Sequence, residues 1–298
     1  MTLVLHPERA RLAGARLFEA FEGSGPGIFG TKEMPEDLLP SGVERGSEEH
    51  LRFITFTVSI DYMRDAVQLW RASREAFESD KARLIFDPTR VMGMAPDDLQ
   101  SWLMNLSISR KHAPDAVTWH AVASVLESFF DGSVAELIQR CDYSAPSLLA
   151  TIRRMPTKIR YLSGPKIGPL WVRMLRDNCD VAIKQMEALP IPVDVHVARA
   201  TLAVGAIESD SSVPEAVLYQ KIRDVWVDAC KGTGFYPMQF DKALWQQSRL
   251  GCTYRSATTC SKGPECGVAD MCVRGRIAFR EGSVEVDTSP LQPMFASA

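Results

Sequence analysis

Four of the seven cysteines in this sequence lie close together near its C-terminal end. They are separated by seven, five and five residues, and are Cys252, Cys260, Cys266 and Cys272. Thiolates are soft ligands that suit zinc or an iron–sulfur cluster. Zinc ribbons usually carry paired C-x2-C knuckles and this stretch has none, so its wider spacing favours a bulky [4Fe–4S] cluster. We therefore predict a metal centre on the loop 252–272, with zinc, or a loop without metal, as the alternatives.

A second candidate site is the stretch Y-L-S-G-P-K-I-G, from Tyr161 to Gly168, which lies between two helical patterns. It predicts a helix, a tight turn and a second helix. Gly164 would allow the backbone to turn or to approach a partner closely. The start of the second helix, where Lys166 would lie, would attract a phosphate through its backbone N–H groups and its dipole. The alternative is an ordinary helical hairpin with a solvated lysine.

A third stretch, I-P-V-D-V-H-V, contains Asp194 directly after Pro192. Proline ends the preceding element, and Asp is a favoured residue for capping the start of a helix. Taken alone, Asp194 is therefore predicted to be a helix N-cap, and His196 to be a packed residue. The three cysteines outside the loop, at 141, 179 and 230, lie in apolar sequence and are predicted to be small core residues.

Helical periodicity dominates the elements that must position these residues. Between Phe53 and Phe77, apolar residues recur mostly at steps of three and four, which gives one apolar helix face. Similar patterns run through residues 97–109, 114–130, 133–140, 147–154, 166–176, 194–205, 214–230 and 239–249. Convincing period-two patterns are absent, and the tail from Glu281 onward has little periodicity. We therefore expect an all-α fold, with residues 23–48 as a long surface connection.

Composition sets broader limits. The chain has 298 residues, 46% of them hydrophobic, and a net charge of −3, which argues mildly against a nucleic-acid partner. The start of the sequence meets charges at once and no segment is apolar enough to span a membrane, so we expect a cytoplasmic protein. Residues 151–176 nevertheless contain seven basic and no acidic residues: Arg153, Arg154, Lys158, Arg160, Lys166, Arg173 and Arg176. Such a stretch can follow a phosphate backbone or form a solvated helix face.

In their order along the chain, the three stretches resemble the endonuclease III / adenine glycosylase superfamily of helix-hairpin-helix DNA glycosylases. Many members carry a hairpin reading L-P-G-V-G-R-K-T-A, then V-D-T-H-V, then a cysteine loop that holds a [4Fe–4S] cluster. The resemblance spans roughly residues 50–275. It implies two helical domains with a DNA cleft between them. The six-helix domain would be 51–165, ending in the hairpin, and the second would combine 1–50 with 166–298 and carry the cluster loop.

The resemblance also implies a function and residue roles. The protein would act on double-stranded DNA in the nucleoid as a monomeric repair enzyme that excises a modified or damaged base. Lys166 would be the nucleophile of an associated AP lyase, and Asp194 the catalytic carboxylate. The implied DNA contacts are Ser163, Gly164, Pro165, Gly168 and Arg160, with Tyr62 as the wedge beside Asp61, where relatives carry an intercalating Gln. The cluster loop would direct Arg255, Lys262 and Arg274 towards phosphate.

The sequence departs from the family pattern in three places. Leu162 replaces the first glycine of the hairpin, Asp194 follows Lys166 by 28 residues, a longer interval than in familiar members, and the cysteines are more widely spaced. The chain is therefore interpreted as a divergent member whose base is not identified. Three alternatives are a monofunctional glycosylase that uses water activated by Asp194, a non-catalytic iron–sulfur DNA-binding protein, and an electron-transfer or regulatory protein that does not bind DNA.

Overall fold

The computed structural model describes residues 3–23 and 28–295, which form twelve α-helices and two small sheets. The chain divides into two compact units. The terminal unit combines Met1–Lys32 with Pro190–Ala298, and the central unit is Glu33–Leu189. No helix among the described residues is long and apolar enough to cross a membrane. The mostly helical fold expected from the periodicity is confirmed, whereas the unit bounds fall elsewhere than at 51 and 165.

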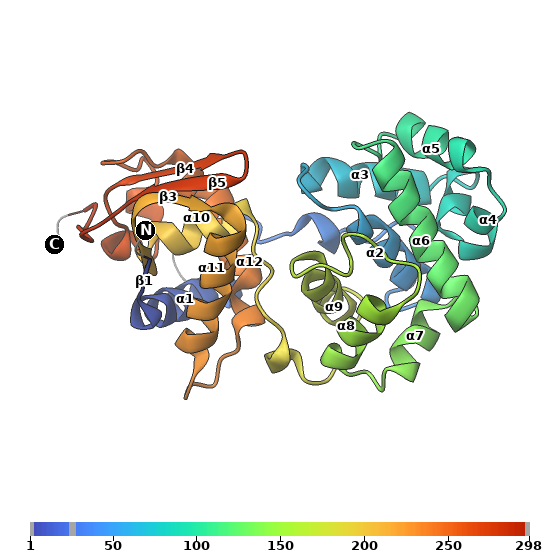
Figure 1. The fold of residues 1–298 in the computed structure, drawn as a ribbon, viewed down its shortest axis with the longest axis horizontal. Coiled ribbons are helices and arrows are strands. Elements are labelled where there is room, and N and C mark those ends of the chain that lie inside the picture. Colours follow the sequence, from blue (N-terminus) through green and yellow to red (C-terminus); the bar gives the residue numbers. More distant parts are fainter. Residues whose placement is uncertain (1–2, 24–27, 296–298) are drawn as a thin grey trace. The chain divides into compact units, whose positions relative to one another are not determined.

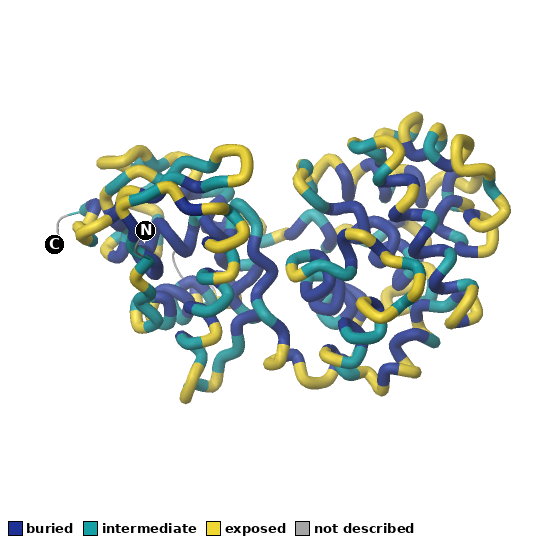
Figure 2. The backbone as a smooth tube through the Cα atoms, in the orientation of Figure 1, coloured by how far each residue is buried: buried dark blue, intermediate teal, exposed yellow. Residues whose placement is uncertain are grey.

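The central unit is entirely helical. Its helices are α2 (Glu48–Ser59), α3 (Ala66–Phe77), α4 (Pro88–Met92), α5 (Pro96–Asn105), α6 (Ala113–Phe130), α7 (Val134–Arg140), α8 (Ala145–Arg154) and α9 (Ile167–Asp177). Short 3-10 turns occupy Pro35–Asp37, Ala82–Phe86 and Met186–Ala188. Helix α2 contacts α3, α6, α7 and α9 and is buried along most of its length, as the dark tube of Figure 2 shows. It is the central helix of this unit (Figure 1).

An aromatic cluster forms the core around α2. The ring of Phe86 lies 4.9 Å from that of Phe77 and 5.2 Å from that of Trp119, and Phe56 lies 5.1 Å from Trp119. All four side chains are almost completely buried. Edge-to-face and tilted contacts of this kind add to the free energy of burying the rings themselves. The single helix read from Phe53 to Phe77 is wrong, because α2 ends at Ser59 and α3 begins at Ala66, and Met63 and Val67 of the predicted face are exposed. The remaining apolar residues of that face are buried.

Helix α9 explains why the central unit extends beyond the predicted boundary at 165. It packs on α2 and α8, and Trp171 Nε1 donates a 3.0 Å hydrogen bond to Thr55 Oγ1. Arg173, which is 2% exposed, pairs at 2.5 Å with the buried carboxylate of Glu36. That contact also ties the 3-10 turn Pro35–Asp37 into this unit. Part of the connection expected at 23–48 is therefore core, and residues 24–27 of it lie outside the described residues.

The terminal unit contains α1 (Pro7–Glu22), α10 (Val195–Ala203), α11 (Glu215–Cys230) and α12 (Asp241–Leu250). Its strands are β1 (Val4–Leu5), β2 (Ile207–Glu208), β3 (Asp210–Pro214), β4 (Arg276–Arg280) and β5 (Ser283–Asp287). Short 3-10 turns lie at Pro237–Phe240, Cys252–Tyr254, Gly263–Glu265 and Ala269–Met271.

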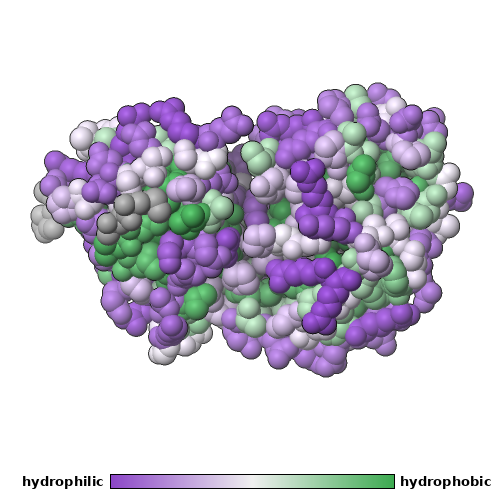
Figure 3. Space-filling view, in the orientation of Figure 1, coloured by the Kyte–Doolittle hydropathy of each residue, from purple (hydrophilic) through white to green (hydrophobic). Residues whose placement is uncertain are grey.

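The visible face of this unit carries a continuous hydrophobic area in the space-filling view (Figure 3).

The two sheets correct the all-α expectation. Strands β1 and β2 pair antiparallel, and β5 lies between β3 and β4 in an antiparallel sheet that aligns Val284 with Val213 and Phe279. Val284 and Val286 are fully buried, whereas the residues between and beside them are more exposed. The segment S-V-E-V-D therefore does alternate with period two. Its five-residue length was too short to stand out beside much longer helical patterns.

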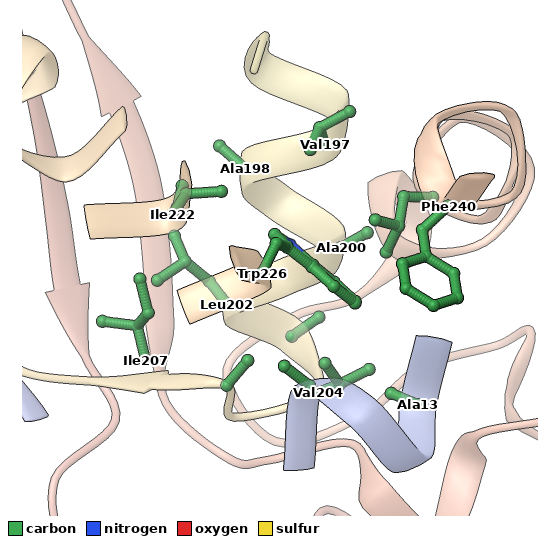
Figure 4. Close-up of a cluster of buried hydrophobic side chains, with 14 of the residues drawn as sticks. Ala13, Val197, Ala198, Ala200, Leu202, Val204, Ile207, Ile222, Trp226 and Phe240 are labelled. Atoms are coloured by element: carbon green, nitrogen blue, oxygen red, sulfur yellow. The ribbon is translucent and has the colours of Figure 1, made fainter. Parts of the chain in front are cut away.

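The core of the terminal unit lies between α1, α10, α11 and α12 (Figure 4). Trp226 on α11 is fully buried, and its indole Nε1 donates a 3.0 Å hydrogen bond to Thr201 Oγ1 on α10. Helix α1 approaches this ring at Gly14, where an added Cβ would lie 2.8 Å from Trp226 and 3.1 Å from Phe240. Glycine is therefore needed in α1 for the close approach of these helices.

Candidate functional site

The predicted hairpin is the connection between α8 and α9. The backbone N–H and the hydroxyl of Ser163 both donate to the carbonyl oxygen of Ile159, at 3.0 and 2.8 Å. Gly164 N donates to the carbonyl oxygen of Tyr161 at 2.8 Å, and a Cβ on Gly164 would come within 2.9 Å of that oxygen. Pro165 follows and is exposed. The turn is thus closed by its own backbone, and glycine is required by its tightness.

Lys166 is the N-cap residue of α9, and no side chain caps this end of the helix among the described residues. Gly168 lies on the first turn, where a Cβ would come within 2.7 Å of the carbonyl oxygen of Leu162. Leu162 is 1% exposed and anchors the turn in the core. Leu162 is therefore a packing residue.

Asp61 lies near Lys166 within the central unit. Burial raises the pKa of Asp61, and the charge of Lys166 and a 3.1 Å hydrogen bond from Trp70 Nε1 act against that rise. The Asp61 side chain is 6% exposed, so it does not project from the surface. No sequence pattern predicts this proximity, because the two residues are far apart along the chain.

Aromatic and basic side chains from three connections meet beside the hairpin, in what we call the tyrosine–lysine group: Tyr62, Lys111, Arg160 and Tyr161. The two tyrosine rings are stacked, with centroids 4.9 Å apart and planes 17° apart. Lys111 Nζ lies 4.8 Å from the ring of Tyr62 and 5.2 Å from that of Tyr161, and the Arg160 guanidinium lies 5.3 Å from Tyr161. Burial and neighbouring arginines lower the pKa of Lys111, whereas the charge of Asp115 raises it.

A buried carboxylate holds the connection that carries Lys111. Asp115, 1% exposed, accepts hydrogen bonds from the backbone N–H groups of Arg110 and Lys111 at 2.9 and 2.8 Å. Arg64, from the connection after α2, approaches the same carboxylate at 3.7 Å. Arg110 in turn donates to the carbonyl oxygen of Met63. Sequence reasoning missed Lys111 and Asp115, because neither belongs to a recognised motif.

The basic stretch 151–176 separates into surface and core residues. The exposed ones are Arg153, Arg154, Lys158 and Arg160. Arg173 points into the core, where it pairs with Glu36, and Arg176 pairs with Asp177 at 2.7 Å. The possibility of a continuous basic surface along the whole stretch is therefore wrong, because Arg173 lies on the face of α9 that packs in the core.

Asp194 caps α10, as predicted from the sequence around it. Its Oδ1 accepts hydrogen bonds from the backbone N–H groups of His196 and Val197 at 2.8 and 2.9 Å. The ring of His196 packs 5.3 Å from that of Trp245, and its Nδ1 lies 3.3 Å from Ser248 Oγ. Asp194 belongs to the terminal unit and Lys166 to the central unit.

All four cysteines of the C-terminal loop line one small cavity that is partly open to solvent. Burial raises the pKa of the thiols of Cys252 and Cys266, and raises that of Cys272 to about 11. No three His, Cys, Asp or Glu side chains among the described residues converge closely enough to hold a metal ion. The sulfur-bearing residues thus surround a space and do not meet at a point. The other cysteines are buried at 141 and 179 and half-buried at 230.

Two of the three basic residues expected to face phosphate from this loop are used within the unit. The Arg255 guanidinium donates to the carbonyl oxygens of Val273 and Gly275 at 2.7 and 3.1 Å. Lys262 pairs with Glu265 at 3.2 Å. Of the three, only Arg274 is exposed and forms no ion pair with another residue of the described ranges. These contacts stabilise the conformation of the loop itself.

The C-terminal tail also has a structural place. Met294 N donates to the carbonyl oxygen of Cys272 at 2.7 Å, and Val273 forms a bridge with Pro293. Phe295 lines the cavity beside Gly263, where a Cβ would lie 2.4 Å from the ring. The weak periodicity after Glu281 therefore reflects a short strand and an irregular segment that covers the cysteine loop.

Comparison with known proteins adds no assignment to this geometry. No protein-family model matches the chain, and no curated protein matches it either.

Proposed function

We propose that this chain is a divergent DNA glycosylase of the endonuclease III superfamily, which removes a modified or damaged base from double-stranded DNA and acts as a monomer. The observation that carries the DNA part of the proposal is the tyrosine–lysine group beside the hairpin. Half-buried cations such as Lys111 attract phosphate, and tyrosine rings offer faces on which bases stack. Exposed Arg153, Arg154 and Lys158 extend the positive charge along the same hairpin.

Backbone strain supports a functional role for these connections. Met63, Ser107 and His112 all have positive φ values, of 54°, 58° and 46°. Residues other than glycine adopt this conformation at an energetic cost, and strained positions tend to cluster at binding sites. Met63 is also 64% exposed, directly after Tyr62. The connection after α2 therefore offers an aromatic and an apolar side chain as candidates for insertion into a base stack.

The proposed chemistry uses Lys166 and Asp194 after the target nucleotide has rotated out of the duplex. The neutral amine of Lys166 attacks C1′, the glycosidic bond breaks, and the bond electrons leave with the base. The nitrogen loses a proton, the C1′–O4′ bond breaks, and O4′ takes up a proton, so the opened sugar is held as a Schiff base. Removal of a C2′ proton then drives β-elimination, which breaks the bond to the 3′ phosphate. The Asp194 carboxylate stabilises the positive charge that develops on the sugar.

We propose a [4Fe–4S] cluster as the cofactor, because all four cysteines of the loop line one cavity. A zinc ion with Zn–S bonds of about 2.3 Å needs its four sulfurs about 3.8 Å apart in a tetrahedron. The wide spacing of the four cysteines, without a paired C-x2-C knuckle, favours the larger group. The cluster would be held by Cys252, Cys260, Cys266 and Cys272, and when bound it supplies structural cross-linking and one-electron redox chemistry.

The enzymatic proposal is tested with duplexes that carry oxidised, deaminated, alkylated or enzymatically modified bases, followed by borohydride. We expect a covalent protein–DNA adduct on at least one duplex, absent in Lys166→Ala and retained in Lys158→Ala, an exposed lysine of the same hairpin. Asp194→Asn keeps a good helix cap but removes the charge, and should slow base release by about 100-fold or more.

Three results would redirect the proposal. Base release without an adduct indicates a monofunctional glycosylase that uses water activated by Asp194. DNA binding without release of any base indicates a non-catalytic DNA-binding protein. A complete lack of salt-dependent DNA binding points to an electron-transfer or regulatory protein, because phosphate contacts must weaken steeply as salt rises.

A further inference from the structure

Two nitrogen donors lie at the cysteine cavity. The first is Gln247 on α12, which lines the cavity and is 2% exposed. Its side-chain Nε2 donates to Cys266 Sγ at 3.1 Å and lies 3.9 Å from Cys252 Sγ. A neutral thiol is a weak acceptor, whereas a thiolate accepts a charge-assisted hydrogen bond. A buried amide that faces sulfur is therefore best satisfied when the sulfur carries negative charge.

The second donor is Arg255, which also lines the cavity. Its terminal nitrogen is fixed by the carbonyl oxygens of Val273 and Gly275. Its Nε is buried and has no hydrogen-bond partner within the part of the chain that the structure describes. A buried N–H without a partner is costly, so it indicates an acceptor that completes the site. Arg255 and Cys272 line the same cavity, and the backbone of Arg255 forms a bridge with Cys260 of the same loop.

Hydrogen bonds and positive charge at cysteine sulfurs both raise the reduction potential of a bound cluster. Reduction adds an electron to a cluster held by four thiolates, so it increases negative charge at the site. N–H donors and a fixed guanidinium stabilise the more negative state and therefore raise the reduction potential. Neither residue needs to touch iron for this effect.

We propose that Gln247 and Arg255 set the reduction potential of the group held by the four cysteines, by donating N–H groups towards the sulfurs of Cys266 and Cys272. The two residues make the reduced state more accessible than the thiolates alone would allow. They are positioning and tuning residues, and take no part in bond cleavage on DNA. This inference rests on the proposed cluster but is independent of the proposed glycosylase activity.

The test is a spectroscopic redox titration of the full chain, purified and reconstituted anaerobically with iron and sulfide. Gln247→Met removes the donor at similar size, and Gln247→Glu replaces it with an acceptor of the same shape. We expect both to lower the ratio of reduced to oxidised cluster at a fixed potential, Gln247→Glu by at least tenfold, which corresponds to about 59 mV for one electron. Arg255→Lys should shift the ratio in the same direction, since lysine keeps the charge but not the fixed N–H geometry.

The matched control is Gln246→Met, a buried neighbour on the same helix that does not line the cavity. Unchanged potentials in all three variants, with intact clusters, would overturn the inference alone. Failure of the unaltered chain to bind any cluster, or stoichiometric zinc in its place, would overturn the cluster proposal as well. If Gln247→Met loses the cluster, the reduction potentials of Gln247→Glu and Arg255→Lys still test the inference. A purely structural role for these residues predicts an unchanged potential in any variant that keeps its cluster.

Discussion

The hairpin of the central unit and the cysteine loop of the terminal unit are both connections rich in glycine and proline, yet they are built in opposite ways. The hairpin closes on itself, through backbone hydrogen bonds at Ser163 and Gly164 and through the buried side chain of Leu162. The loop 252–272 runs through short 3-10 turns around a cavity. One connection is complete without a ligand, and the other surrounds a space that polar groups face.

This difference separates two sources of stability. Burying an aliphatic side chain such as Leu162 stabilises the fold by about 1.5–3 kcal/mol and depends on no cofactor. In the loop, burial disfavours the thiolate forms of Cys252, Cys266 and Cys272. A bound metal centre reverses that preference, because its positive charge stabilises thiolates and releases their protons. Folding of the terminal unit should therefore be linked to metal binding, and folding of the central unit should not.

The largest expected effect comes from removing the proposed metal centre. Structural metal sites can contribute on the order of 10 kcal/mol to folding, so chelation or Cys252→Ser should strongly destabilise the terminal unit. Hydrogen exchange measured by mass spectrometry should show faster exchange across α12 and β5, with residues 33–189 unchanged. Cys230→Ser, on α11 and away from the cavity, is the control and should keep both colour and protection. Equal loss of protection in both units would contradict the comparison.

The next effect belongs to the central unit. Arg173→Met leaves the Glu36 carboxylate buried without its partner, which should lower the free energy of unfolding by about 3–5 kcal/mol. The metal content should not change. The matched control is Arg154→Met in the same basic stretch, which is exposed and should change stability by less than about 0.5 kcal/mol. Urea unfolding followed by tryptophan fluorescence measures both, and similar losses would refute the assignment of Arg173 to the core.

The residues discussed above show which features of the fold and of the candidate site could be predicted from the sequence alone. Long helical periods predicted the helices well, and the Pro192–Asp194 pattern predicted the cap of α10, because these signals are local. Arg173 was misassigned to a surface stripe, since composition does not reveal which face of a helix turns inward. Lys111 and Gln247 could not be found, because their importance depends on contacts between segments distant in sequence. The spacing of the cysteines predicted a shared loop, but not the donors beside it.

A smaller loss of stability is expected from a change in helix packing of the terminal unit that does not affect metal binding. Gly14→Ala places a methyl group 2.8 Å from Trp226, so it should destabilise this unit by about 1–3 kcal/mol even with its metal centre loaded. Gly234→Ala has open space around its Cβ and a backbone that alanine can adopt, and should be neutral or stabilise by about 0.4–1 kcal/mol. Thermal unfolding of the loaded proteins measures both. A neutral Gly14→Ala would show that α1 can shift away from Trp226.

The smallest expected effect is a pH dependence confined to the central unit. Burial, aided by the charge of Arg45, lowers the pKa of His50 from 6.5 to about 4, against the opposing charge of Asp180. Its Nδ1 accepts a 3.2 Å hydrogen bond from Gly46 N, which requires the neutral ring on that side. The unfolded chain therefore binds a proton more readily than the folded chain between these two pKa values. The stabilisation is complete above pH 6.5 and is lost as the pH falls towards 4.

His50→Gln retains an acceptor for the Gly46 N–H group but does not titrate. The loss of unfolding free energy between pH 7.5 and pH 5 should therefore be about 1–2 kcal/mol greater in the unaltered chain than in the variant. Urea unfolding at the two pH values measures this difference, and carboxylates that titrate in both proteins cancel from it. The same experiment on the terminal unit should show a pH dependence set by its thiols, which protonate and release metal as the pH falls. Identical pH profiles for His50→Gln and the unaltered chain would show that protonation of His50 does not destabilise the folded chain.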